Sequence, residues 1–297
     1  MIRRVTALAA VVATALALAA CGSGGSGGPG APTSTPHAAQ NVTDKDFDRG
    51  SFHDPTAIDN QWMPLQPGTQ LVYRGYINEE DRRVEHRVVF TVTDLTKVID
   101  GVPTVVVLDR DYNAGQLTES ELAFQAQDDN GTVWSFGEYP EEWEDRKFTG
   151  APDTWIVGQA GARAGILMRA EPQVGTPQYL QGWAPKIDFS DTAKVLHTGQ
   201  RTCVPVRCYD NVLVTDEWSP SEPGAHQQKY YAAQVGNVRV DFAGSQDKDK
   251  DKETLSLVKV VHLDKPGLAA IHQQALAMDK HAYTASKALY QHTPPAG

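Results

Sequence analysis

A series of short segments rich in β-branched residues, separated by turn sequences, is the feature that most restricts how this chain can fold. Asp100-Gly101 separates two such segments and Asp128-Asp129-Asn130-Gly131 separates the next two, which is the pattern of successive β-hairpins. Because hardly any helical periodicity interrupts the series, we predict a mainly β fold: a curled antiparallel sheet or half-barrel with a C-terminal helix. The predicted strands span residues 69–76, 83–93, 103–109, 117–127, 132–136, 191–197, 211–217, 227–233, 238–242 and 254–263.

Two regions depart from the strand pattern. Residues 158–179 contain four glycines and two prolines, so we expect a long loop packed over the sheet. After Lys265-Pro266-Gly267, alanine-rich sequence predicts a helix of about 20 residues that ends before Pro294. We expect this helix to pack across the sheet or to cap its open end.

The N-terminal residues have the layout of a lipoprotein signal peptide. Arg3 and Arg4 precede an apolar run over residues 5–20, which is shorter than the roughly 20 residues that a helix needs to span a bilayer. Leu18-Ala19-Ala20-Cys21 resembles the bacterial lipobox, in which the cysteine thiol receives a diacylglyceryl group before the leader is removed. We therefore predict lipidation of Cys21 and a location on the extracytoplasmic face of the cell membrane. The alternative is a secreted protein with an incidental cysteine.

This interpretation divides the chain into a signal peptide (1–20), a flexible tether rich in glycine, serine and proline (21–50), an antiparallel β domain (51–264), and a C-terminal helix and tail (265–297). The tether composition does not allow burial of apolar area. A hydrolase-like G-x-S-x-G pattern around Ser26 lies inside the tether. Because it lacks the strand and the helix that such a motif requires, we assign no catalytic role to Ser26.

Removal of the leader makes the chain more acidic. It takes away two of the 27 basic residues and none of the 37 acidic ones, so the mature net charge is 25 minus 37, or −12. Such a surface repels polyphosphates, and we therefore exclude nucleic acid as a partner. The predicted partners are the membrane, through the lipid anchor, and a lipid or other apolar ligand.

Cys203 and Cys208 remain once Cys21 is lipidated, and their spacing is C-x4-C. An even number of cysteines outside the cytoplasm indicates a disulfide. The four intervening residues are about the length of a hairpin loop, so the two cysteines can face each other across a turn. A zinc site would need two further ligands, and redox catalysis would favour C-x-x-C, so both alternatives are weaker.

Tryptophans recur beside the predicted strand turns. A curled sheet with a helix across it can leave an apolar cavity between them, although most of these side chains are expected in the core. The candidate ligand-binding residues are Trp134, Trp155, Trp183 and Trp218.

Carboxylates gather around Trp143: Glu138, Glu141, Glu142, Glu144 and Asp145. A pair of them could perform acid–base chemistry on a glycoside, with the tryptophan as a sugar platform, and oxygen ligands in this number also suit calcium. A solvated acidic loop explains the cluster without chemistry. The aspartates of residues 247–253 imitate an EF-hand loop but lack its glycine and its last glutamate. We predict no metal site, no cofactor and no catalytic residue.

Several short motifs resemble a family of uncharacterised bacterial envelope lipoproteins over about residues 58–242. The motifs are NQWMPLQPGT (60–69) with Tyr73, AQD (126–128), VWSFGE (133–138), VP (204–205), DNVLVT (210–215) and KYYA (229–232). No activity is established for that family, and the resemblance implies a fold similar to the half-barrel sheets that wrap around a helix in envelope lipoprotein carriers. Its other members usually have glycine and no cysteine pair in the turn at 204–208. This departure favours a bridge that stabilises the hairpin over a catalytic role for the thiols.

The leading functional hypothesis is an exported, lipid-anchored, non-enzymatic module that binds or scaffolds an apolar small molecule or an envelope component. The alternative is an envelope glycan hydrolase that uses the acidic cluster near Trp143. The first predicts a cavity lined by aromatic side chains, without a convergent ionisable pair. The second predicts two facing carboxylates in an open cleft.

Overall fold

The computed structural model describes residues 43–79, 82–222, 224–244 and 252–297. Cys21, Ser26 and most of the EF-hand-like stretch at 247–253 lie outside the described residues. The described chain is mainly β, which confirms the predicted fold class: fifteen strands form one antiparallel sheet, followed by a C-terminal helix. Among the described residues, no helix is long and apolar enough to cross a membrane.

Long hairpins build the first half of the sheet. Its strands are β1 (Thr69–Glu79), β2 (Arg82–Ile99), β3 (Val102–Asn113), β4 (Gln116–Gln127), β5 (Val133–Glu144), β6 (Lys147–Gly150), β7 (Trp155–Ile156), β8 (Arg163–Met168) and β10 (Gly182–Trp183). The β2–β3 turn is the predicted Asp100-Gly101, and both residues have positive φ (50° and 83°), as a type I′ turn requires.

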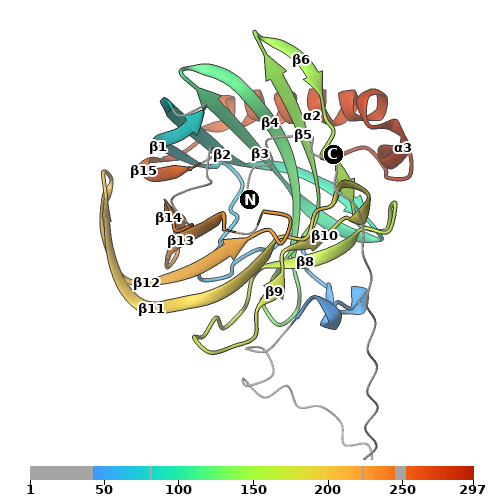
Figure 1. Ribbon diagram of the computed structural model, residues 1–297. Helices are drawn as coiled ribbons and strands as arrows, with labels where there is room; N and C mark the ends of the chain where they lie inside the picture. The colour runs from blue at the N-terminus through green and yellow to red at the C-terminus, as the bar shows by residue number, and fades with distance from the viewer. Residues whose placement is uncertain (1–42, 80–81, 223, 245–251) are drawn as a thin grey trace, which may run out of the picture.

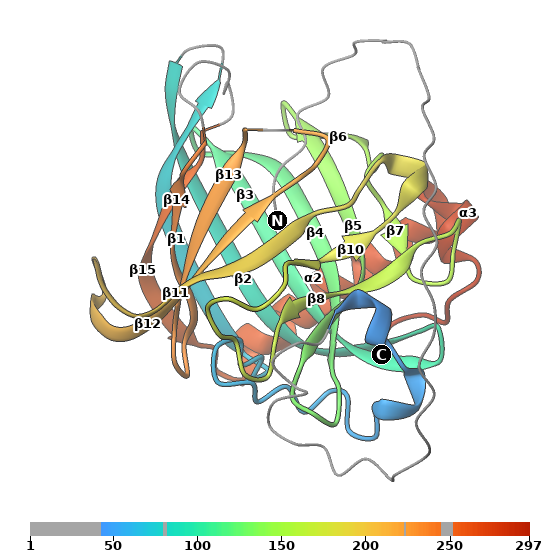
Figure 2. The same cartoon turned by 60° about the horizontal axis from the view of Figure 1, so that its bottom comes forward.

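The second half of the sheet joins the first through pairing of β15 with β1. Its strands are β9 (Tyr179–Leu180), β11 (Thr192–Val204), β12 (Arg207–Trp218), β13 (His226–Ala232), β14 (Gly236–Phe242) and β15 (Thr254–His262). The hydrogen-bonded order is β10-β8-β5-β4-β3-β2-β1-β15-β14-β13-β12-β11-β9, with β6 and β7 beside β5. Only Gln181 separates β9 from β10, so one chain segment contributes the strands at both ends of this order. The sheet curls but does not close into a barrel (Figures 1 and 2).

The expectation of a long loop over residues 158–179 was wrong in part, because β8 lies within it. Gly165, which we took as a loop glycine, belongs to this strand. A Cβ atom at Gly165 would lie 2.2 Å from the backbone of Gln181, so the glycine permits a close approach of two chain segments.

The predicted helix is present as α2 (Lys265–Ala285), followed after a break at Ser286 by the short α3 (Lys287–Tyr290). Asp264 caps its start by accepting a hydrogen bond from the Gly267 N–H at 2.9 Å. The helix packs across the sheet, which is one of the two placements we predicted. It covers the outer, convex side of β2–β5 (Figures 1 and 2), so the implied arrangement of a sheet wrapped around its helix is wrong for this chain.

A buried ion pair attaches the helix and the C-terminal tail to β2. The Lys97 ammonium donates to Asp279 Oδ1 of α2 at 2.8 Å, to the Pro294 carbonyl at 2.8 Å and to the Tyr283 hydroxyl at 3.1 Å. Both charged side chains are almost fully buried, at 0% and 3% exposed. Asp279 Oδ2 accepts from the Ala296 N–H at 3.0 Å. The two buried charges therefore satisfy each other and are also hydrogen-bonded to neighbouring groups.

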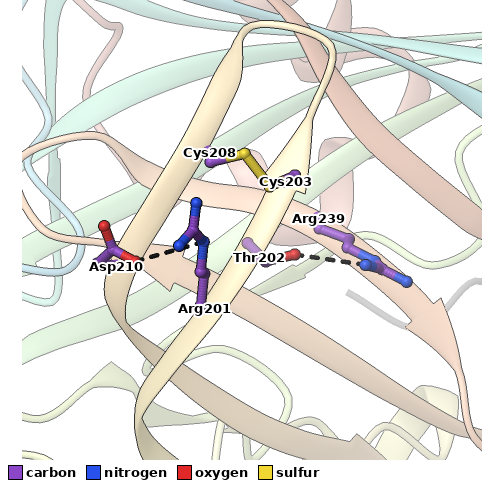
Figure 3. Close-up of a disulfide and its surroundings, with 6 residues drawn as sticks. All are labelled: Arg201, Thr202, Cys203, Cys208, Asp210 and Arg239. Carbon is purple, nitrogen blue, oxygen red and sulfur yellow. Dashed lines mark hydrogen bonds and ion pairs between the residues drawn. A yellow bond between two sulfur atoms is a disulfide. The ribbon is translucent and has the colours of Figure 1, made fainter.

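The predicted disulfide joins Cys203 and Cys208 at the end of the β11–β12 hairpin (Figure 3). The two cysteines are directly opposite each other in the strand register, and Val204 is opposite Arg207. The turn is therefore only the two residues Pro205 and Val206, shorter than the predicted four-residue loop.

Substitution of one member of the buried ion pair is expected to destabilise the fold strongly. Lys97→Met leaves the Asp279 charge buried without a counterion, so we expect a loss of about 3–5 kcal/mol in the free energy of unfolding. The double variant Lys97→Met/Asp279→Leu removes both charges and is expected to recover most of that loss. Urea unfolding followed by circular dichroism measures both values.

Arg201→Ala provides the control, because its ion pair with Asp210 is long (3.5 Å) and both side chains are more than two-thirds exposed. We expect a change of less than about 1 kcal/mol. Equal losses in Lys97→Met and in the double variant would contradict the assignment of the penalty to an uncompensated charge.

Candidate functional site

The inner face of the curled sheet encloses a cavity of about 190 Å³. A single buried water needs only about 10–15 Å³, so the cavity has room for a small molecule. Side chains alternate between the two faces of β3, β4 and β5. Val106, Leu108, Leu122, Phe124 and Tyr139 belong to the core beneath the helix. Their sequence neighbours Asp109, Glu121 and Glu138 are on the other face and line the cavity.

The cavity-facing residues of β3–β5 are mainly acidic, and we call them the acidic wall: Asp109, Asp111, Glu119, Glu121 and Glu138. The strand register places Asp109 opposite Glu121 and Asp111 opposite Glu119. Glu138 is opposite Ala123, which makes it a diagonal neighbour of Glu121 on the same face. Asp191 and Glu253 line the cavity from other elements, and Lys229 is the one Lys or Arg among its described lining residues.

Burial among like charges shifts the proton affinity of the acidic wall. Burial, reinforced by the charges of Asp191 and Glu119, raises the pKa of Glu138 to about 8. Burial and the neighbouring charges of Glu138, Glu119 and Asp109 also raise the pKa of Glu121 well above its usual range. Both carboxyl groups therefore hold protons at a pH where an exposed glutamate is ionised.

Lys229 has its counterion within the same sheet. Its ammonium lies 2.7 Å from Glu217 Oε2, and Glu217 Oε1 accepts hydrogen bonds from the Thr215 hydroxyl at 2.8 Å and the Tyr231 hydroxyl at 3.3 Å. The Glu217 charge raises the pKa of Lys229 against the opposing effect of burial. The lysine charge is thus compensated by Glu217.

A second polar group lies where β2, β13 and β15 approach each other. Glu253 Oε2 accepts from the Gln227 side-chain amide at 2.7 Å, and Glu253 Oε1 lies 2.8 Å from His86 Nε2. This contact fixes the orientation of the Gln227 amide, so its Oε1 is an acceptor. Among the described residues, neither Gln227 Oε1 nor Oε1 of Gln125 on β4 has a hydrogen-bond partner, although both side chains are buried and line the cavity.

The lining next to the acidic wall is apolar, beginning with Val88 and Phe90, which are paired with Asp111 and Asp109, and we call it the apolar wall. Its side chains come from β1, β2, β14 and β15: Leu71, Tyr73, Val88, Phe90, Val240 and Leu255. Tyr73 keeps its hydroxyl satisfied by donating to the Asn237 carbonyl at 2.7 Å. A ligand in this cavity contacts hydrocarbon on one side and carboxyl groups on the other.

The structure does not bring the four candidate tryptophans together, and none of them lines the cavity. Trp134 is in the core on the helix side, where its indole N–H donates to Asp128 at 2.9 Å. Trp155 is buried and stacked on Phe189, which does line the cavity, with ring centroids 5.2 Å apart. Trp183 and Trp218 are half-buried, beside Arg163 and His226 respectively. A ligand-binding role for these residues stays a prediction.

Strand alternation also divides the acidic cluster around Trp143. Glu138 faces the cavity, whereas Glu141 faces the helix and accepts hydrogen bonds from the Tyr139 hydroxyl at 2.9 Å and from His281 at 2.7 Å. Glu144 and Asp145 are exposed at the β5–β6 turn. Among the described residues, no group of three or more His, Cys, Asp or Glu side chains is arranged to hold a metal ion.

Sequence reasoning missed the acidic wall except for Glu138. The signal was available in part: Asp109 ends one predicted strand and Asp111 lies two residues beyond it, while Glu119 and Glu121 are two residues apart on the next predicted strand. Residues with this spacing share one face of a strand, and a hairpin brings the two pairs side by side.

Two solved structures are similar to this chain. A "putative exported protein with YmcC-like fold" from Bacteroides fragilis is 13% identical, with a TM-score of 0.36, and the match covers 68% of this chain and 99% of that one. A "putative lipoprotein" from Parabacteroides distasonis is 10% identical, with the same TM-score and the same coverage. No family model and no curated protein matches the chain. Membership of the lipoprotein family that the motifs resemble therefore stays a prediction.

Neutralising Glu138 is expected to stabilise the protein at alkaline pH. Between about pH 4.3, the usual glutamate value, and the raised pKa of about 8, the folded state keeps a proton that the unfolded chain releases, so stability falls as the pH rises through this window. Glu138→Gln cannot ionise. We expect it to exceed wild type by roughly 1–3 kcal/mol at pH 9 and to match it at pH 4.

Denaturant unfolding at the two pH values measures this difference. Glu144→Gln, on the exposed end of the same strand, removes the same charge and is expected to change stability little at either pH. A Glu138→Gln variant that is less stable than wild type at pH 9 would show that the Glu138 charge is compensated in the folded protein.

Proposed function

We propose that this chain is an exported, lipid-anchored envelope lipoprotein whose curled sheet binds a small molecule in its inner cavity without catalysing its conversion. The observation that carries the proposal is the cavity itself, about 190 Å³ between the apolar wall and the acidic wall. Binding sites for small molecules are concave and largely apolar, with a few polar groups that fix the orientation of the ligand.

The buried polar groups of the cavity are placed at a cost in folding free energy, and this cost supports a binding role for the cavity. A core selected only for stability would not keep the Gln125 and Gln227 carbonyl oxygens without partners. Nor would it collect carboxyl groups whose neighbours disfavour their ionisation. Such costs are typical of sites that a ligand completes.

The placement of the carboxyl groups favours binding over glycan hydrolysis. A glycosidase needs two carboxyl groups that flank the scissile bond. Glu121 and Glu138, the two with the strongly raised pKa values, form a convergent ionisable pair that the binding hypothesis did not predict. They are, however, side by side on the same face of the sheet and do not face each other across a cleft. The cluster near Trp143, which carried the hydrolase hypothesis, is divided between the two faces and the exposed turn.

Filling the cavity is expected to remove a bound molecule from the protein. Val88 is on the apolar wall, so Val88→Trp occupies the space that the ligand needs. Native mass spectrometry of protein purified from its own host should show a retained small molecule on wild type that Val88→Trp lacks. Val98→Trp is the matched control, because Val98 is on the same strand but 39% exposed. Leu255→Phe provides a second, smaller cavity-filling substitution should the tryptophan variant not fold.

A molecule retained equally by wild type and by both cavity-filling variants would contradict the proposed site.

Replacement of Cys21 is expected to release the protein from membranes. The predicted anchor carries two acyl chains at one residue, which gives durable attachment where a single chain is marginal. Cys21→Ala should therefore move from the detergent phase to the aqueous phase in a detergent-partition experiment on cell extracts. The variant Cys203→Ala/Cys208→Ala keeps Cys21 and should remain in the detergent phase. Wild type in the aqueous phase would contradict lipid anchoring.

A further inference from the structure

We propose that the cavity ligand is an organic cation, a small molecule that carries an ammonium group on an apolar body. This inference rests on the proposed binding function and specifies the chemistry of its ligand. It follows from three properties of the cavity: the sign of its charge, the kind of hydrogen-bonding group left without a partner, and the arrangement of the two walls.

The charge of the lining is strongly one-sided. Seven carboxyl side chains line the cavity among the described residues, and the one lysine, Lys229, is 2.7 Å from the carboxylate of Glu217. An anionic ligand would add to this repulsion. A neutral lipid chain would bring no charge that offsets those of the carboxyl groups. An ammonium group favours ionisation of the nearby carboxyl groups and relieves their mutual repulsion.

The unsatisfied groups in the cavity are acceptors. Gln227 Oε1 is fixed as an acceptor by the hydrogen bond of its amide nitrogen to Glu253, and Gln125 Oε1 is buried without a partner on the other side. Both need a donor from the ligand. An ammonium group has three N–H donors and no acceptor, so it matches this set, whereas a carboxylate ligand offers acceptors only.

The arrangement favours an organic cation over a metal ion. A metal ion requires several ligands within one coordination sphere, and no such group exists among the described residues. The acidic wall instead spreads over three strands, and the apolar wall begins on the next strand, β2, and continues over β1, β15 and β14. This division fits a molecule with a charged end and a hydrocarbon end.

Binding of hexylammonium, 1-hexanol and hexanoate separates these possibilities, because the three probes share one hydrocarbon chain and differ in the head group. In titration calorimetry at pH 7, we expect hexylammonium to bind at least tenfold more tightly than 1-hexanol, and hexanoate not to bind. Glu121→Gln and Glu138→Gln should each weaken hexylammonium binding by roughly tenfold. Glu144→Gln, the same substitution at an exposed position, should leave the affinity unchanged. Thermal unfolding confirms that each variant is folded.

Proton release provides a second measurement. The charged groups that line the cavity with Glu138 are Asp109, Asp111, Glu119 and Glu121 on the same wall, and Asp191, Lys229 and Glu253 from outside that wall. Because an arriving ammonium favours the ionised form of Glu138, binding at pH 7 should release a proton to the buffer. The observed enthalpy should then differ between phosphate and Tris buffers for wild type, and this difference should shrink in Glu138→Gln.

The outcomes separate the inference from the function on which it rests. Hexanol or hexanoate binding as tightly as hexylammonium overturns the cation inference, and so does the absence of binding by all three probes. A neutral or anionic molecule that native wild type retains and Val88→Trp loses also overturns it, while the proposed binding function stands. A ligand that is unaffected by the cavity-filling variants removes the proposed site, and the inference fails with it.

Discussion

The fold depends on the two-residue period of β3, β4 and β5. One face of these strands must be apolar because α2 and α3 cover it, with Leu108, Leu122 and Tyr139 in the shared core. The same period sends Asp109, Glu121 and Glu138 to the cavity. A slip of one residue in any of these strands would place a carboxyl group beneath the helix and a large apolar side chain among the carboxyl groups. The helix on the outside therefore determines which side chains form the acidic wall on the inside.

The protein treats its buried charges in two different ways. On the outer face, Lys97 and Asp279 satisfy each other and also bond the C-terminal tail, so their burial is compensated within the fold. Lys229 and Glu217 form a similar compensated pair in the second half of the sheet. Glu121 and Glu138 instead have raised pKa values because burial and like charges disfavour their ionised forms. This contrast supports the proposed binding site, because a site that a ligand completes is the expected place for carboxyl groups whose ionised forms the fold disfavours.

Local sequence signals predicted most of the sheet, because a hairpin is specified by residues close together in the chain. Asp100-Gly101 forms the expected turn, and Cys203 and Cys208 are opposite each other as their spacing suggested. The strand β8 was missed because a glycine such as Gly165 is typical of loops. In the structure, the glycine is needed in the strand because the backbone of Gln181 approaches it closely. The candidate tryptophans could not be sorted from sequence, since Trp134 in the core and Trp155 near the cavity occupy similar positions beside turns. The spacing of the acidic-wall residues shows that they share one face of their strands. Which face of the strands contacts the helix depends on long-range packing, so the sequence alone does not predict it.

Both halves of the sheet contribute to the cavity. The acidic wall comes from β3–β5, whose other face is committed to the helix, whereas the apolar wall comes from β1 and β2 of the first half and from β14 and β15 of the second. The halves meet through the β1–β15 pairing on one side and through the segment around Gln181 on the other. A ligand that contacts the acidic wall together with Val240 or Leu255 therefore bridges the two halves of an open sheet. Its binding free energy adds to the stability of the curled arrangement, because only that arrangement brings these residues into one cavity.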